Sequence, residues 1–169
     1  DGKQIWNAAN AENFASDSHT MFLGSSAGPS QFFPGEIDEV KIYAYARSAA
    51  QIKSDYAAGL ASSATNKGSG AALGAPPGSG GAFSNGLIGY WKMDDNTGTT
   101  TTDSSGNSMT GTLGTGGSAP SWSSGKFGPN LSFSGNNQYV SLPITSLGAT
   151  FSLSAWINPS SLPNTYHTI

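Results

Sequence analysis

Short stretches of alternating apolar and polar residues recur along this chain, separated by glycine, asparagine, serine and aspartate. The best strand pattern near the N-terminus is GEIDEVKIY at residues 35–43, preceded by a short apolar strand at residues 20–24. From residue 87 onward five further patterns follow at regular intervals: LIGYWKM, TGTL, NLSFSG, QYVSL and FSLSAWI. Several short strands with turns between them predict an all-β fold, either a sandwich or a jelly roll.

The last pattern predicts a strand with one buried and one solvated face. Alternation puts two sets of side chains on opposite faces: Phe151, Leu153, Ala155 and Ile157 on one, and Ser152, Ser154 and Trp156 on the other. A single tryptophan in a strand is more often a core residue than a binding residue, so both Trp91 and Trp156 are predicted to pack in the interior.

One helix and one linker interrupt the strand patterns. Ser48 is the predicted N-cap of a helix over residues 49–58, and Gly59 is predicted to end it. Residues 59–85 are rich in Gly, Ala, Ser and Pro without periodicity, which is typical of a flexible linker. The chain thus divides into residues 1–58, the linker, and residues 86–169. Because it begins with Asp1 and ends just after a strand pattern, we expect a piece of a longer protein.

Composition excludes several classes of function. The 169 residues include only seven Lys and Arg and carry a net charge of −3, so no basic surface for nucleic acid or anionic lipid is expected. No stretch approaches the ~18 apolar residues of a membrane-spanning helix, so we predict no membrane insertion. Cysteine is absent, which excludes a disulfide framework and a thiol nucleophile.

Two stretches resemble a known family. Residues 33–48, FPGEIDEVKIYAYARS, resemble the closing motif of bacterial laminin G-like domains, which belong to the concanavalin A-like lectin/glucanase superfamily. Residues 86–95, GLIGYWKMDD, with TDSSGN at 102–107 and SGKFG at 124–128, are similar to the opening of such a domain. Residues 1–3, DGK, resemble a hairpin that occurs late in these domains. The resemblance implies an all-β, concanavalin A-like jelly-roll sandwich, here partial, with one short helix.

The order of these motifs differs from that of one complete domain, because the closing motif comes first. The simplest interpretation is the C-terminal strands of one laminin G-like domain (1–58), a linker (59–85) and the N-terminal strands of a second domain (86–169). Since the first and last strands are sheet neighbours in this family, the alternative is that the two halves pair with each other across the linker. Closing a loop of this length costs only a few kcal/mol.

Candidates for catalysis are few. His19 and His167 lie near opposite ends of the chain, and no Gly-x-Ser-x-Gly elbow is present. Glycoside hydrolysis needs two carboxyl groups that face each other across a sugar bond. The E-x-D-x-E signature of laminarinase-like relatives is absent, since the chain has Glu36-Ile37-Asp38-Glu39. We therefore predict that the protein is not an enzyme.

A calcium site is the better hypothesis. Asp38 shares strand parity with Val40 and Ile42, and a carboxylate on a buried face is costly unless paired, hydrogen-bonded or metal-bound. If the opening and closing strands are neighbours, Asp38 converges with Asp94 and Asp95, and hard oxygen ligands suit Ca²⁺. Relatives of this family often bind structural calcium. The alternative is that each aspartate caps a local turn, which we favour for Asp103 in TDSSGN.

Carbohydrate is the expected ligand class. Trp122, in a loop-like stretch, and Tyr139, beside Asn136-Asn137-Gln138, are the candidate sugar-binding aromatics. The resemblance implies a non-catalytic, extracellular or cell-surface, lectin-like module that binds a polysaccharide or a cell-surface glycan beside neighbouring domains of a larger protein. The alternatives are a structural spacer repeat, or an accessory domain of a glycoside hydrolase or sialidase.

Overall fold

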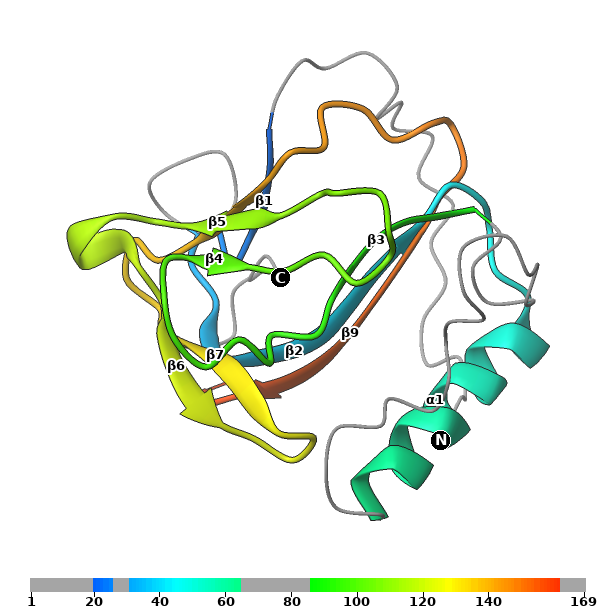
Figure 1. Cartoon of the computed structure of the whole chain (residues 1–169), viewed down its shortest axis with the longest axis horizontal. Helices are drawn as coiled ribbons and strands as arrows, with labels where there is room; N and C mark the ends of the chain where they lie inside the picture. Colours follow the sequence, from blue (N-terminus) through cyan, green and yellow to red (C-terminus); the bar gives the residue numbers. More distant parts are fainter. Residues whose placement is uncertain (1–19, 26–30, 65–85, 162–169) are drawn as a thin grey trace.

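Two antiparallel sheets face each other in the computed structural model, which describes residues 20–25, 31–64 and 86–161 (Figure 1). The four-stranded sheet has the order β1-β8-β5-β4: β1 (Met21–Leu23), β8 (Val140–Leu142), β5 (Gly111–Leu113) and β4 (Thr100–Thr101). The five-stranded sheet has the order β3-β2-β7-β6, with β9 paired to β2: β3 (Leu87–Trp91), β2 (Pro34–Tyr43), β7 (Pro129–Ser134), β6 (Ser121–Ser124) and β9 (Ser152–Pro159). The all-β prediction is confirmed.

Strand β2 joins the two halves of the chain. One edge of β2 pairs with β9 over most of its length, and the other edge is shared by β7 and β3. The register places Val40 opposite Trp91 of β3 and Ile37 between Leu131 of β7 and Ile157 of β9. The strand of the closing motif, β2, therefore lies in one sheet with β3, the first strand after the linker, and with β7 and β9. The division into two tandem domains stays a prediction, and residues 1–3 and both histidines lie outside the described residues.

The core fills the space between the two sheets. Trp91 is completely buried, as predicted, and its indole N–H donates to the carbonyl oxygen of Met109 (2.7 Å). Both halves of the chain supply the buried apolar side chains around it, namely Leu23, Phe33, Ile37, Val40, Ile42, Met93, Leu113, Leu131, Phe133, Val140, Leu142, Ile144 and Leu147.

A β-bulge in β2 reverses the predicted orientation of Asp38. Glu39 has a positive φ of 53°, and the pairing with β9 shifts between Asp38 and Lys41. The extra residue resets the alternation, so Ile37 and Val40 both point into the core although they are three positions apart. Asp38 lies opposite Trp156 on the other face of the sheet. The prediction that Asp38 shares a face with Val40 was therefore wrong; we call the face that carries Asp38 the outer face.

The side chains of β9 alternate between two faces as predicted, but the apolar face is only partly buried. Ala155 packs against the core, whereas Leu153 and Ile157 each stay 42% exposed, because β9 has a described neighbour along one edge only. Trp156 lies on the serine-bearing outer face, half-buried, and the prediction that it belongs to the core was wrong.

Helix α1 (Ala49–Ala64) begins where the sequence predicts and ends later. The Ser48 hydroxyl accepts from the Gln51 N–H (3.3 Å) and the Gln51 amide accepts from the Ser48 N–H (2.8 Å), which together form a capping box. Gly59 does not end the helix. Glycine costs about 1 kcal/mol relative to alanine within a helix, and the helix-forming residues on both sides, many of them alanine, outweigh this cost. Within the described residues, neither α1 nor the short 3-10 helix at Gly116–Ser118 contains an apolar stretch of membrane-crossing length.

Candidate binding site on the outer face of the five-stranded sheet

A pocket of about 390 Å³ lies on the outer face where β7, β2 and β9 run side by side. We call it the Asp38 pocket. Its lining combines carboxylate, amide, ammonium and aromatic groups: Glu36, Asp38, Lys126, Phe127, Asn130, Trp156, Ile157 and Asn158. Three strands and the turn between β6 and β7 supply these residues, so the pocket exists only when the two halves of the chain are paired.

Aromatic rings form one wall of the pocket. The centroid of the Trp156 ring lies 4.5 Å from that of Phe127, with the planes tilted by 50°, and 5.4 Å from that of Tyr56 in a stacked arrangement. The Lys126 ammonium lies 5.9 Å from the Trp156 centroid. The rim is completed by the paired strands β2 and β9, where the Asn158 amide donates to a Glu36 carboxylate oxygen (3.1 Å). The wall thus offers an apolar surface next to hydrogen-bonding groups.

Asp38 is a buried carboxyl group in the pocket with a raised pKa. It is 6% exposed, and its Oδ1 accepts one hydrogen bond, from the Glu39 N–H (2.9 Å). Burial, and then the negative charge of Glu39, raise the pKa of Asp38 to about 7; Asp94 adds to the effect, while the Glu39 N–H and Lys41 oppose it. At neutral pH this carboxyl group is therefore close to its own pKa.

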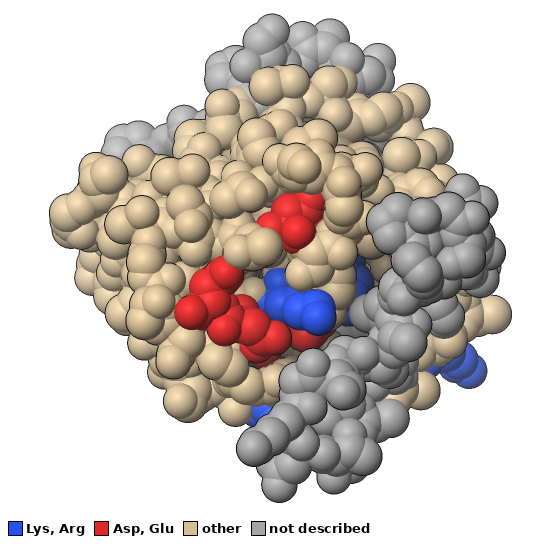
Figure 2. Space-filling view, in the orientation of Figure 1, with Lys and Arg blue, Asp and Glu red and all other residues tan. Residues whose placement is uncertain are grey.

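Carboxylates gather beside Asp38. In Figure 2 a group of acidic side chains lies next to basic side chains near the centre of the view. Glu39 accepts from the Tyr90 hydroxyl and forms an ion pair with Lys41 (3.3 Å). Burial, and then the negative charge of Glu39, raise the pKa of Tyr90. Partial burial and then Glu39 raise the pKa of Asp94. Asp38, Glu39 and Asp94 thus form an acidic cluster with Lys41 as a cation inside it.

The predicted calcium ligands are brought together only in part. Asp94 lies near Asp38, and its Oδ1 is 3.0 Å from the position of a β-carbon on Gly128, in the turn that lines the pocket. Asp95 instead accepts from the Thr102 N–H (3.0 Å) and hydroxyl (2.5 Å), which caps a local loop. No group of three or more His, Asp or Glu side chains in the described part of the chain is placed to hold a metal ion.

Asn130 is a site residue that sequence reasoning missed. It is 2% exposed, lines the Asp38 pocket, and its Oδ1 has no hydrogen-bond partner among the described residues. A buried amide oxygen without a donor costs about 1–3 kcal/mol, so it favours a ligand that supplies a donor or a cation. Asn130 precedes Leu131 in β7, so alternation could have predicted that Asn130 points outward. The residues that surround Asn130 in the pocket come from other strands, and only strand pairing reveals them.

Asp103 has the turn role that the sequence favoured. Its Oδ1 accepts from the N–H groups of Tyr90 (3.0 Å) and Ser105 (2.8 Å), and its Oδ2 accepts from the Met109 N–H (2.9 Å) and the Ser105 hydroxyl (2.8 Å). Burial alone would raise the pKa of Asp103, but the hydrogen bonds outweigh it and lower the pKa. The carboxylate thus holds the loop after β4 against β3.

Replacing Asp103 with asparagine is expected to lower the free energy of unfolding by about 2 kcal/mol, since the amide NH₂ then faces backbone donors. Thermal and urea unfolding of the variant measure this loss. Asp95→Asn, whose carboxylate lies in an exposed loop, is the matched control and should cost under about 1 kcal/mol. Equal losses in the two variants would contradict the assigned role of Asp103.

The two predicted sugar-binding aromatics lie apart from the Asp38 pocket. Trp122 is on β6, packs against the edge of the core, and its indole N–H donates to the Gly98 carbonyl (3.1 Å). Tyr139 precedes β8 in the other sheet and contacts the Phe22 ring edge-on at 5.3 Å. Neither lines the Asp38 pocket, and their role in sugar binding stays a prediction.

Two facing antiparallel sheets form a β-sandwich with a polar and aromatic pocket on the face of one sheet. A laminin G family model, described as the concanavalin A-like lectin/glucanases superfamily, matches residues 1–53. This segment includes the whole closing motif at residues 33–48, so the predicted resemblance to a laminin G-like domain is confirmed there, and the match supports a lectin-like or adhesion-type module. No curated protein and no solved structure matches the chain.

Proposed function

We propose that the protein is a non-catalytic, extracellular carbohydrate-binding module and that a glycan occupies the Asp38 pocket. The observation that carries this proposal is the pocket lining, in which the Trp156 and Phe127 rings stand beside carboxylate and amide groups. Sugars present apolar C–H faces and a rim of hydroxyl groups. A pocket that combines an apolar wall with several polar groups matches both features.

The hydrogen-bonding groups of the pocket suit hydroxyl ligands. Asp38 and the free Oδ1 of Asn130 accept, while Lys126 and the amide of Asn158 donate. The two carboxylates of the lining, Glu36 and Asp38, both belong to β2 and therefore share one wall. The E-x-D-x-E signature of laminarinase-like hydrolases is absent from this strand, which favours binding without catalysis.

Binding to a polysaccharide panel tests the proposal. The probes are β-1,3-glucan, β-1,4-glucan, xylan, mannan, galactan and chitin, assayed by affinity electrophoresis and microarray. We expect binding to at least one of them, weakened about tenfold by Phe127→Ala, which removes part of the aromatic wall. Thr112→Ala, at the exposed residue of β5 in the other sheet, is the control and should bind normally. A blank panel would overturn the proposal in favour of a spacer repeat without its own ligand.

We further propose calcium as a structural ion beside the pocket. Asp38 and Asp94 are its carboxylate ligands and Asn130 its amide ligand. Burial and neighbouring negative charge raise the pKa of both carboxyl groups, so a cation there is favourable, and the Asn130 Oδ1 has no partner among the described residues. Ca²⁺ prefers carboxylate and amide oxygens. Asp95 is no longer a ligand, since it is bound to Thr102.

A melting scan in millimolar Ca²⁺ and in chelator tests the calcium site. We expect a higher melting temperature with Ca²⁺, and a smaller difference in Asp94→Asn, because a ligand that binds only the folded state stabilises it. Coincident curves for the unmodified protein in Ca²⁺ and in chelator would contradict this proposal.

A further inference from the structure

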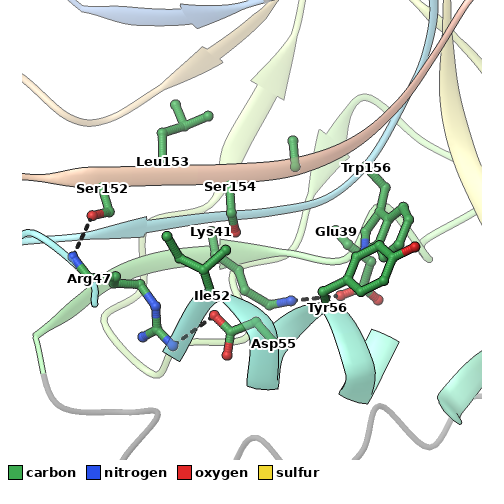
Figure 3. Close-up of a pocket in the computed structure, with 11 residues that line it drawn as sticks. Glu39, Lys41, Arg47, Ile52, Asp55, Tyr56, Ser152, Leu153, Ser154 and Trp156 are labelled. Carbon is green, nitrogen blue, oxygen red and sulfur yellow. Dashed lines mark hydrogen bonds and ion pairs between the residues drawn. The ribbon is translucent and has the colours of Figure 1, made fainter. Parts of the chain in front are cut away.

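We infer that the binding surface continues along β9 past Trp156 into a second pocket, so that the ligand is an internal stretch of a linear glycan chain rather than a terminal sugar. This inference rests on the proposed carbohydrate-binding function and extends it. The second pocket has a volume of about 350 Å³ and lies between helix α1 and the outer face of the five-stranded sheet (Figure 3). We call it the helix pocket.

Trp156 lines both pockets. Its ring stacks on Tyr56 from the helix pocket and contacts Phe127 in the Asp38 pocket. The two pockets also share the same strands: β2 contributes Asp38 to one and Lys41 to the other. They are therefore consecutive along the outer face, with the indole as their common wall.

The two pockets together are long enough for several sugar units. Their β9 lining runs from Ser152 to Asn158, a span of about 20 Å at ~3.3 Å per residue. A single monosaccharide fills only one of the two pockets. A linear chain that passes over the Trp156 ring reaches both.

The helix pocket offers side chains rather than backbone to a ligand. In Figure 3, Ser152 and Ser154 point from β9 toward α1, while Leu153 points away. Lys41 and Glu39 form an ion pair on the facing strand. The backbone groups of β2 are already used in pairing with its sheet neighbours, so a ligand on this face of the sheet meets side chains rather than the β2 backbone. A ligand rich in hydroxyl groups fits the mixed donors and acceptors of these side chains.

The helix side of the pocket is held in place by fixed contacts. Arg47 forms an ion pair with Asp55 of α1 (Nη2 to Oδ2, 2.7 Å) and lies over the Tyr43 ring at 4.1 Å. The Arg47 N–H also donates to the Ser152 hydroxyl (2.9 Å), which ties the start of β9 to the segment before the helix. These contacts keep the pocket open between α1 and β9 before any ligand arrives, which reduces the cost of binding.

Binding of an oligosaccharide length series tests this inference. The probes are oligosaccharides of the polysaccharide bound in the panel, from disaccharide to hexasaccharide, titrated calorimetrically into the full chain. We expect the affinity to rise at least about tenfold over the series. Ser154→Gln places a longer side chain in the helix pocket and is expected to remove this gain. Ser121→Gln, an exposed β6 residue outside both pockets, is the matched control and should keep the gain.

The outcomes separate the inference from the function on which it rests. If disaccharide and hexasaccharide bind equally well, or if Ser154→Gln keeps the full gain with length, the extended surface is refuted while carbohydrate binding stands. If no polysaccharide binds, the proposed function itself fails. Circular dichroism and melting of each variant verify that a lost gain is not lost folding.

Discussion

Replacing Asp38 with asparagine is expected to stabilise the calcium-free protein at pH 8 by about 3 kcal/mol. The ordinary pKa of 3.8 rises to about 7 on folding, and each unit corresponds to about 1.4 kcal/mol. Asparagine removes the buried charge and keeps an oxygen for the Glu39 N–H, at the smaller cost of burying an amide. Urea unfolding in chelator measures the difference between the two proteins.

The pH dependence of this effect has a definite sign. Between pH 4 and pH 7 the folded state holds a proton on Asp38 that the unfolded state has lost, so stability falls as the pH rises. Asp38→Asn should remove most of this fall, while the charges of Glu39, Asp94 and Lys41 around it are unchanged. A variant that is no more stable than the unmodified protein at pH 8, or that keeps its full pH slope, would contradict the assigned burial of Asp38.

Replacing Trp91 with alanine is expected to lower the free energy of unfolding by about 3–5 kcal/mol, enough to unfold a marginally stable domain. Trp91 has no solvent exposure, lies opposite Val40 of the closing motif, and its indole N–H bonds to Met109. The substitution leaves a large cavity where the two halves of the chain meet. Denaturant unfolding followed by far-UV circular dichroism measures the loss.

Trp122→Ala is the control for this prediction, because Trp122 packs only at the edge of the core and should cost clearly less. If the two halves share one core, Trp91→Ala shifts a single cooperative transition. An unfolding curve with two steps, of which only one moves, would show instead that residues on either side of the linker fold as separate units.

Much of the fold was predictable from alternation. Each strong pattern, from GEIDEVKIY to FSLSAWI, contains a strand, and Ser48 caps the helix as predicted. The failures have local causes. The bulge at Glu39 shifts the phase of β2 by one residue, and simple alternation cannot detect an extra residue within a strand. Gly59 lies within α1 because neighbouring helix formers outweigh it.

The site was less predictable than the fold. Asp38 was identified because strand parity with Val40 predicted a buried carboxylate. The predicted face was wrong, but Asp38 is still buried, on the outer face opposite Trp156. Phe127, Asn130 and Asn158 come from three segments that only strand pairing brings together. For Trp156 the signal was present: it alternates with Ser152 and Ser154, so its face was the solvated one, yet the general preference of tryptophan for the core was given more weight.

An engineered disulfide tests the central claim, that the closing motif and the later strands form one sandwich with the site on its outer face. Glu36 lies opposite Asn158 in the β2–β9 pair, and the chain has no cysteine of its own. The double variant Glu36→Cys, Asn158→Cys is therefore expected to form an intramolecular disulfide under mild oxidation, seen as a monomer on a non-reducing gel and mapped by mass spectrometry.

In the control variant Glu36→Cys, Ser121→Cys, the two positions are separated by two strand spacings, about 10 Å, and should remain reduced. A bond in the first variant and none in the control is the predicted result. If Glu36→Cys, Asn158→Cys stays reduced or forms only cross-linked dimers, the two halves do not pair within one chain, and the pocket that depends on their pairing does not form there.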